Sequence, residues 1–187
     1  KGNPFRFGVW VDGHFSWIGP EWEKDLRYHD NSLVTDVLLK NNAMGLELRC
    51  SDVVDSDLNV YIKKIEVVNL QGKERQVRLF FNHDFHLYGN DIGDTAYFDP
   101  RTHSIEHYKA NRYFLINCGN AENCGVDYVA CGDKEVPGRE GIWKDAEDGE
   151  LSGNPVSWGS ADSAIGIWLS LPSNGRAAAF YWVAAGM

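Results

Sequence analysis

The residue types best suited to chemistry gather in the run His83-Asp84-Phe85-His86, and a turn-rich loop over residues 89–100 follows it. Imidazoles and carboxylates are the usual general acids, general bases and metal ligands. We expect a long strand over residues 76–88, on which His83 and His86 would point to opposite faces. The two histidines are therefore a poor metal-binding pair, and a hydrogen-bonded histidine inside the protein is the simpler interpretation of His83.

Two groups of aspartates resemble cation sites without having the pattern of one. Asp52, Asp55 and Asp57 lack the glycine at the sixth position and the glutamate at the twelfth that a calcium loop requires. The second group lies in the loop after the histidines and consists of Asp91, Asp94 and Asp99. Turn and cap roles are the default for such loop aspartates. We therefore predict no metal ion and no cofactor.

The cysteines are Cys50, Cys118, Cys124 and Cys131. Their spacing contains no CxxC pair, so we expect no structural zinc site. All except Cys124 stand in strand-like segments and are best interpreted as small buried apolar residues. A disulfide between Cys118 and Cys124 across a short loop is left open. Reduced thiols slightly favour a cytoplasmic location.

No motif assigns a catalytic centre to this sequence. It has no glycine-rich phosphate loop, no HExxH and no G-x-S-x-G. Glycoside hydrolysis needs a pair of carboxylates. Acidic residues are plentiful on the expected loops, but the sequence alone brings no two of them to the required separation. We therefore predict no catalytic residue within the chain.

Charge and composition narrow the range of partners. The formal net charge of −9 and a pI near 5.1 argue against nucleic acid and anionic membrane as partners. No apolar run approaches the ~20 residues of a membrane span. The aromatic content of 13%, with 7 Trp, suits an all-β core and a sugar-binding surface equally well.

Hydrophobic residues recur with a period of two along almost the whole chain. Asp12-Gly13 predicts a tight hairpin, a register slip at Lys63-Lys64 predicts a β-bulge, and a helical turn is expected only around residues 144–148. The expected strands cover residues 7–11, 15–18, 22–28, 33–40, 46–54, 58–69, 76–88, 103–108, 113–117, 126–131, 164–171 and 177–185. This pattern indicates an all-β protein, a single large antiparallel β-sandwich over residues 1–187.

Several longer motifs are specific enough to compare with known proteins. They are FRFGVWVDG (5–13), RLFFNHDF (78–85), GDTAYFDP (93–100) and WKDAEDGELSGNP (143–155). In this order they resemble the amino-terminal domain of prokaryotic glucoamylase-type enzymes of glycoside hydrolase family 15. The resemblance extends from about residue 3 to residue 186.

This resemblance implies a fold, a parent protein and a role. The family's amino-terminal domain is a supersandwich similar to that of galactose mutarotase. A separate α/α-barrel domain follows it and hydrolyses α-glucosidic bonds with two glutamates, neither of which maps onto this chain. The chain is thus expected to be a fragment of a longer protein, with the family's first strands missing before Lys1, and to act as a non-catalytic module that docks on its own catalytic barrel.

We expect polar residues on a strand face and in two loops to form the domain interface. These candidates are His83, Asp84, His86, Asp94, Tyr97, Asp145, Glu147 and Asp148. As an alternative, the chain is a carbohydrate-binding module for α-glucan oligosaccharides, with aromatic side chains stacked on sugar rings. The stacking candidates are Tyr97, Tyr108, Trp143 and Trp158. A third alternative is a mutarotase-like epimerase that would use His83 or His86 with Glu106.

Overall fold

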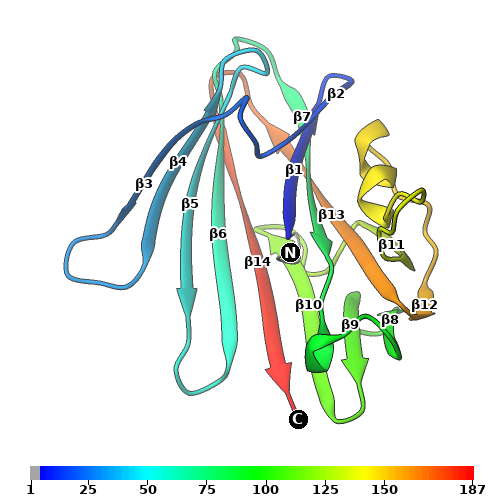
Figure 1. Ribbon diagram of the computed structural model, residues 1–187. Coiled ribbons are helices and arrows are strands. Elements are labelled where there is room, and N and C mark those ends of the chain that lie inside the picture. The colour runs from blue at the N-terminus through cyan, green and yellow to red at the C-terminus, as the bar shows by residue number, and fades with distance from the viewer. Residues whose placement is uncertain (1–4) are drawn as a thin grey trace.

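The computed structural model describes residues 5–187 as two antiparallel sheets packed face to face (Figure 1). Its strands are β1 (Arg6–Val11), β2 (His14–Trp17), β3 (Glu23–Tyr28), β4 (Thr35–Asn41), β5 (Leu46–Val54), β6 (Val60–Asn69), β7 (Arg75–His83), β8 (Asp94–Asp99), β9 (Ser104–Lys109), β10 (Arg112–Asn120), β11 (Tyr128–Asp133), β12 (Val156–Gly159), β13 (Ala161–Leu171) and β14 (Arg176–Gly186). Two 3₁₀ helices are η1 (Leu87–Gly89) and η2 (Ile142–Asp148). The predicted all-β antiparallel sandwich is confirmed.

The two sheets differ in size, and each strand pairs antiparallel with its neighbours. The smaller sheet has the order β11-β13-β7-β1-β2, and the larger one has the order β12-β8-β9-β10-β14-β6-β5-β4-β3. Alternate residues of each strand enter the space between the sheets, as Val77, Leu79 and Phe81 do from β7 and Ile65 and Val67 from β6. The alternating hydrophobic pattern therefore sets the inner faces.

The predicted bulge at Lys63-Lys64 is wrong. The register of β6 with both neighbours is unbroken through this point. Lys63 instead points to the inner face, where its Nζ lies 2.6 Å from Asp52 Oδ1. Because a carboxylate on the adjacent strand neutralises the lysine, the polar residue keeps the period of two and no extra residue is needed.

The strand predicted over residues 76–88 is too long, because β7 ends at His83 and the chain turns away from Asp84 onward. The following loop is shorter than expected, since residues 94–99 form β8. The predicted helical turn at residues 144–148 is confirmed by η2, which lies beside β11 and β13 (Figure 1).

Large aromatic side chains cover the outer face of the five-stranded sheet. Gly8 and Gly166 make room for them, because a Cβ on Gly8 would lie 2.5 Å from Phe15 and one on Gly166 would lie 2.7 Å from Phe80. Phe80 is fully buried although it points away from the main core.

No helix within residues 5–187 is both long enough and apolar enough to cross a membrane.

Candidate functional site

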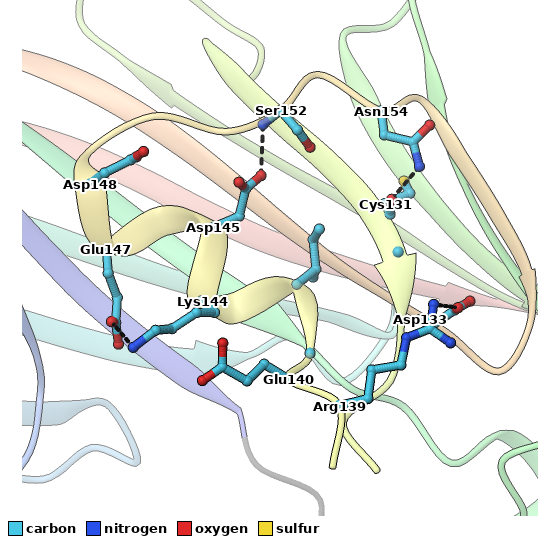
Figure 2. Close-up of a pocket in the computed structure, with 13 residues that line it drawn as sticks. Cys131, Asp133, Arg139, Glu140, Lys144, Asp145, Glu147, Asp148, Ser152 and Asn154 are labelled. Carbon is cyan, nitrogen blue, oxygen red and sulfur yellow. Dashed lines mark hydrogen bonds and ion pairs between the residues drawn. The ribbon is translucent and has the colours of Figure 1, made fainter. Parts of the chain in front are cut away.

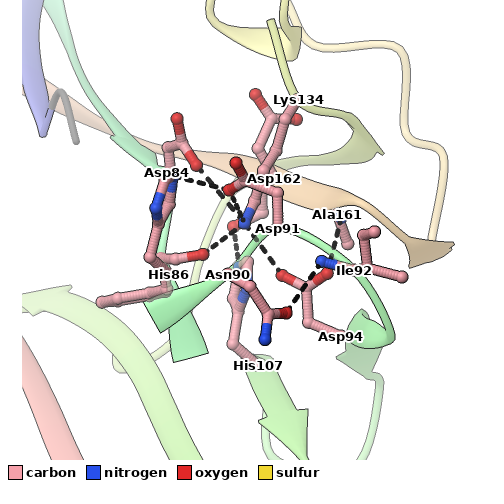
Figure 3. Close-up of polar contacts among 12 residues, drawn as sticks. Asp84, His86, Asn90, Asp91, Ile92, Asp94, His107, Lys134, Ala161 and Asp162 are labelled. Carbon is pink, nitrogen blue, oxygen red and sulfur yellow. Dashed lines mark hydrogen bonds and ion pairs between the residues drawn. The ribbon is translucent and has the colours of Figure 1, made fainter. Parts of the chain in front are cut away.

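A buried lysine gathers the carboxylates around the predicted histidine run (Figure 3). Lys134 Nζ lies 3.1 Å from Asp94 Oδ2, 3.2 Å from Asp91 Oδ1 and 3.5 Å from Asp84 Oδ1, and it also donates to the Phe85 carbonyl. The Lys134 side chain is only 3% exposed. This lysine follows β11, so it ties that strand to the end of β7 and to the start of β8.

Three aspartates share one lysine in this centre. Burial alone lowers the pKa of the Lys134 ammonium, but the surrounding carboxylates outweigh it and keep the pKa above its ordinary value. Burial raises the pKa of Asp84, and the positive charge of Lys134 offsets only part of this increase. The neighbouring Asp162 is also buried, and burial raises its pKa to about 7. Little in the sequence indicates this centre, because Lys134 lies far along the chain from the three aspartates.

Asp84, His86 and Asp91 bring three potential ligand atoms within 4.8 Å of one another. The Lys134 ammonium, however, already lies against both of these aspartates. It takes the place that a bound cation would have, so the group forms an internal ion-pair centre.

His83 lies between the sheets in a chain of buried hydrogen bonds. Its Nε2 is 2.9 Å from Tyr181 Oη and its Nδ1 is 3.1 Å from Ser163 Oγ, which in turn lies 2.8 Å from His107 Nε2. Burial lowers the pKa of His83 to about 3. Glu106 lies on the opposite face of β9 from His107, so its side chain points away from these buried hydrogen bonds. The structure does not bring His83 and Glu106 together as a mutarotase-like pair.

Three of the predicted interface residues line a surface hollow of about 790 Å³ beside η2 (Figure 2). They are Asp145, Glu147 and Asp148. All three have partners within the domain. Asp145 accepts a hydrogen bond of 2.7 Å from the Ser152 amide, Asp148 accepts one of 2.9 Å from the Glu150 amide, and Glu147 pairs with Lys144 at 2.6 Å. The hollow is accordingly open and polar.

Three of the four predicted stacking residues share the outer face of the nine-stranded sheet. Trp158, Thr95, Tyr108 and Tyr113 are direct register partners on β12, β8, β9 and β10. We call these four residues the aromatic row. Tyr97 lies beside it and meets Tyr108 edge-on at 6.2 Å, while the ring of Tyr113 stacks on Tyr108 at 5.6 Å.

Trp143, the fourth stacking candidate, lies elsewhere. It belongs to η2, and its indole Nε1 donates to Glu135 at 3.1 Å. The Arg6 guanidinium lies 4.4 Å from the centre of its ring. One face of this indole is therefore already occupied within the domain.

A second surface on the same outer face was not predicted. Trp182, Ile62 and Val53 are register partners on β14, β6 and β5, and Phe180 and Leu115 share their face. We call these five residues the apolar patch. Phe180 is 42% exposed and Val53 is 38% exposed. Farther along, the face becomes charged, with ion pairs such as Arg49–Glu47 at 2.8 Å and Arg176–Glu66 at 3.4 Å.

The chain is similar to a known protein in structure, although its sequence matches no family profile or curated protein. Among solved structures, a bacterial glucoamylase complexed with acarbose is similar, with a TM-score of 0.73 and 15% sequence identity. The chain has the fold of part of that glucoamylase. The match covers 97% of this chain and 26% of the glucoamylase chain, so the present chain spans about a quarter of its length.

Proposed function

We propose that the chain is a non-catalytic β-sandwich domain of a glucoamylase-type glycoside hydrolase of family 15, part of a longer polypeptide. The helical domain of that polypeptide would carry the catalytic glutamates and hydrolyse α-glucosidic bonds. The observation that supports this most is the fold match, which takes up nearly all of this chain but only 26% of the glucoamylase chain.

The apolar patch is the surface best suited to docking on such a helical domain. A contiguous exposed apolar area on a folded domain marks an interaction surface. Here Phe180 is 42% exposed and Val53 is 38% exposed. The neighbouring Trp182 and Ile62 are half-buried. The charged half of the same face would remain in water. The polar interface predicted from the sequence remains a proposal. Of its predicted members, His86 and Asp148 are exposed, and Asp84, Tyr97, Asp145 and Glu147 are half-buried.

An activity assay tests whether hydrolysis requires the rest of the polypeptide and is absent from the 187-residue chain. The 187-residue chain and the intact polypeptide that carries it are each incubated with maltotriose, and the released glucose is measured. We expect release by the intact polypeptide and none by the 187-residue chain. Hydrolysis by the 187-residue chain, or an intact polypeptide that leaves α-glucosides untouched, would refute the proposal.

A further inference from the structure

We propose that the aromatic row, Trp158-Thr95-Tyr108-Tyr113, is a binding site for a neutral oligosaccharide that lies across β12, β8, β9 and β10. The choice of α-linked glucose as the sugar rests on the proposed function. The inference that the row binds an oligosaccharide rests on its own geometry. The row shares no residue with the apolar patch, so sugar binding and domain docking are separate properties of the same face.

The geometry of the row suits a chain of sugar rings. Its four residues are direct cross-strand partners, so they stand in a straight line over four strands. Neighbouring strands lie about 4.8 Å apart, which places Trp158 and Tyr108 about 10 Å apart along the line. That spacing is comparable with two linked pyranose rings. An extended oligosaccharide can therefore contact the indole and the tyrosines at once.

Trp158 is the side chain that points most clearly to a ligand. It is 73% exposed, although it stands on a hydrogen-bonded strand. An exposed indole contributes little to the stability of its own domain, whereas its flat apolar face and its N–H group suit a partly polar partner. Sugar rings offer such a surface, since their C–H faces stack on aromatic rings and their hydroxyls form hydrogen bonds.

Polar groups for those hydroxyls flank the row. Thr95 lies within it, and Tyr108 and Tyr113 carry phenol groups. Glu106 and Tyr97 are register partners one pair farther along the same face, and burial together with the nearby Glu106 carboxylate raises the pKa of the Tyr97 phenol. The combination of aromatic rings and hydroxyls suits the C–H faces and hydroxyls of a neutral polyol.

The buried lysine centre holds the row in place. Asp94 precedes Thr95 and is the register partner of Gly159, which follows Trp158. Its Oδ2 lies 3.1 Å from Lys134 Nζ, and its Oδ1 accepts a hydrogen bond of 3.1 Å from the Ala161 amide. This buried carboxylate thus ties the start of β8, next to Thr95, to Lys134 and to the start of β13, which follows closely after Trp158 in the chain. Asp94 and Lys134 are positioning residues in this account.

The test is a titration of the folded 187-residue chain with maltotriose, isomaltotriose and cellotriose, followed by heteronuclear NMR. We expect saturable shifts of the Trp158 indole N–H and of the amides around Tyr108 with at least one of the α-linked sugars. Trp158→Ala should weaken that binding at least tenfold. Trp168→Ala is the matched control, because Trp168 is a 40% exposed tryptophan on the other sheet, and it should leave binding unchanged.

Several outcomes would overturn the proposal. One is the absence of saturable shifts with all three sugars in a chain whose spectrum shows it to be folded. Another is undiminished binding by Trp158→Ala. A third is protection of Trp158 from solvent in the sugar-free intact polypeptide, which would assign the row to the domain interface. Failure of the titration leaves the docking proposal standing, because the apolar patch is tested separately.

Discussion

At the residue scale, Lys134 is a buried cation on which three carboxylates converge. Its ammonium contacts three carboxylates that belong to the end of β7, the loop after it and the start of β8. Breaking a buried ion pair by removing one partner is costly, because the remaining charge is left without compensation. Lys134 therefore holds these three segments against the end of β11.

We expect Lys134→Met to lower the free energy of unfolding by about 3–5 kcal/mol in urea denaturation. Lys144→Met is the control, because Lys144 also pairs with a carboxylate, Glu147, but its side chain is 47% exposed. A surface pair of this kind contributes at most ~1 kcal/mol. Equal effects of the two variants would contradict the importance of the buried centre.

Asp162 gives stability a defined pH dependence. Burial raises its pKa to about 7 from the ordinary 3.8, so the folded state favours the protonated form. Its contribution to stability is fully present below pH 3.8 and is lost as the pH rises through 7, by up to ~1.4 kcal/mol per pH unit. Asp162→Asn stays neutral, and its carbonyl oxygen can still accept the bond of 3.1 Å from the Ile142 amide.

The stability of Asp162→Asn relative to the natural chain should therefore increase from pH 5 to pH 8 in urea denaturation. Comparing the two proteins at each pH cancels the titration of all other groups. A difference that stays constant over this range would mean that Asp162 ionises in the folded state as it does in water.

At the element scale, alternating patterns predicted most strands, and they failed where a polar residue has a charged partner on another segment of the chain. Lys63 suggested a bulge, yet it pairs with Asp52 on the neighbouring strand. Residues 94–99 were expected to belong to the turn-rich loop over residues 89–100. Asp94 is nevertheless an inward strand residue, neutralised by Lys134. A pattern within one strand does not indicate such pairs, because their two members lie in different segments of the chain.

The outer layer of the five-stranded sheet depends on glycines at close contacts. A Cβ on Gly166 would lie 2.7 Å from Phe80 and 3.2 Å from Tyr128, and Phe80 is fully buried. We expect Gly166→Ala to destabilise the domain by about 1–3 kcal/mol through overpacking. Gly186→Ala is the control, because a Cβ there meets no atom within 4 Å. Thermal unfolding of both variants checks this, and equal midpoints would count against the packing argument.

At the scale of the whole molecule, the aromatic row and the apolar patch form because the strand register of the nine-stranded sheet aligns residues from separate segments. Trp182, Ile62 and Val53 come from three separate segments, and pairing places them in one line. The sequence marked Tyr97, Tyr108 and Trp158 as aromatic candidates, but it could not show that they share a face while Trp143 does not. It also gave no indication of the apolar patch, because isolated apolar residues in strands are expected to be core.

The docking of the apolar patch is tested most directly by hydroxyl-radical labelling of the 187-residue chain and of the intact polypeptide, read out by mass spectrometry. Trp168 serves as the internal reference, because it is 40% exposed on the other sheet. We predict that labelling of Phe180 and Trp182 falls several-fold in the intact polypeptide while that of Trp168 is unchanged. Equal labelling of Phe180 and Trp182 in both proteins would contradict the account, because the patch would then be free of any partner domain.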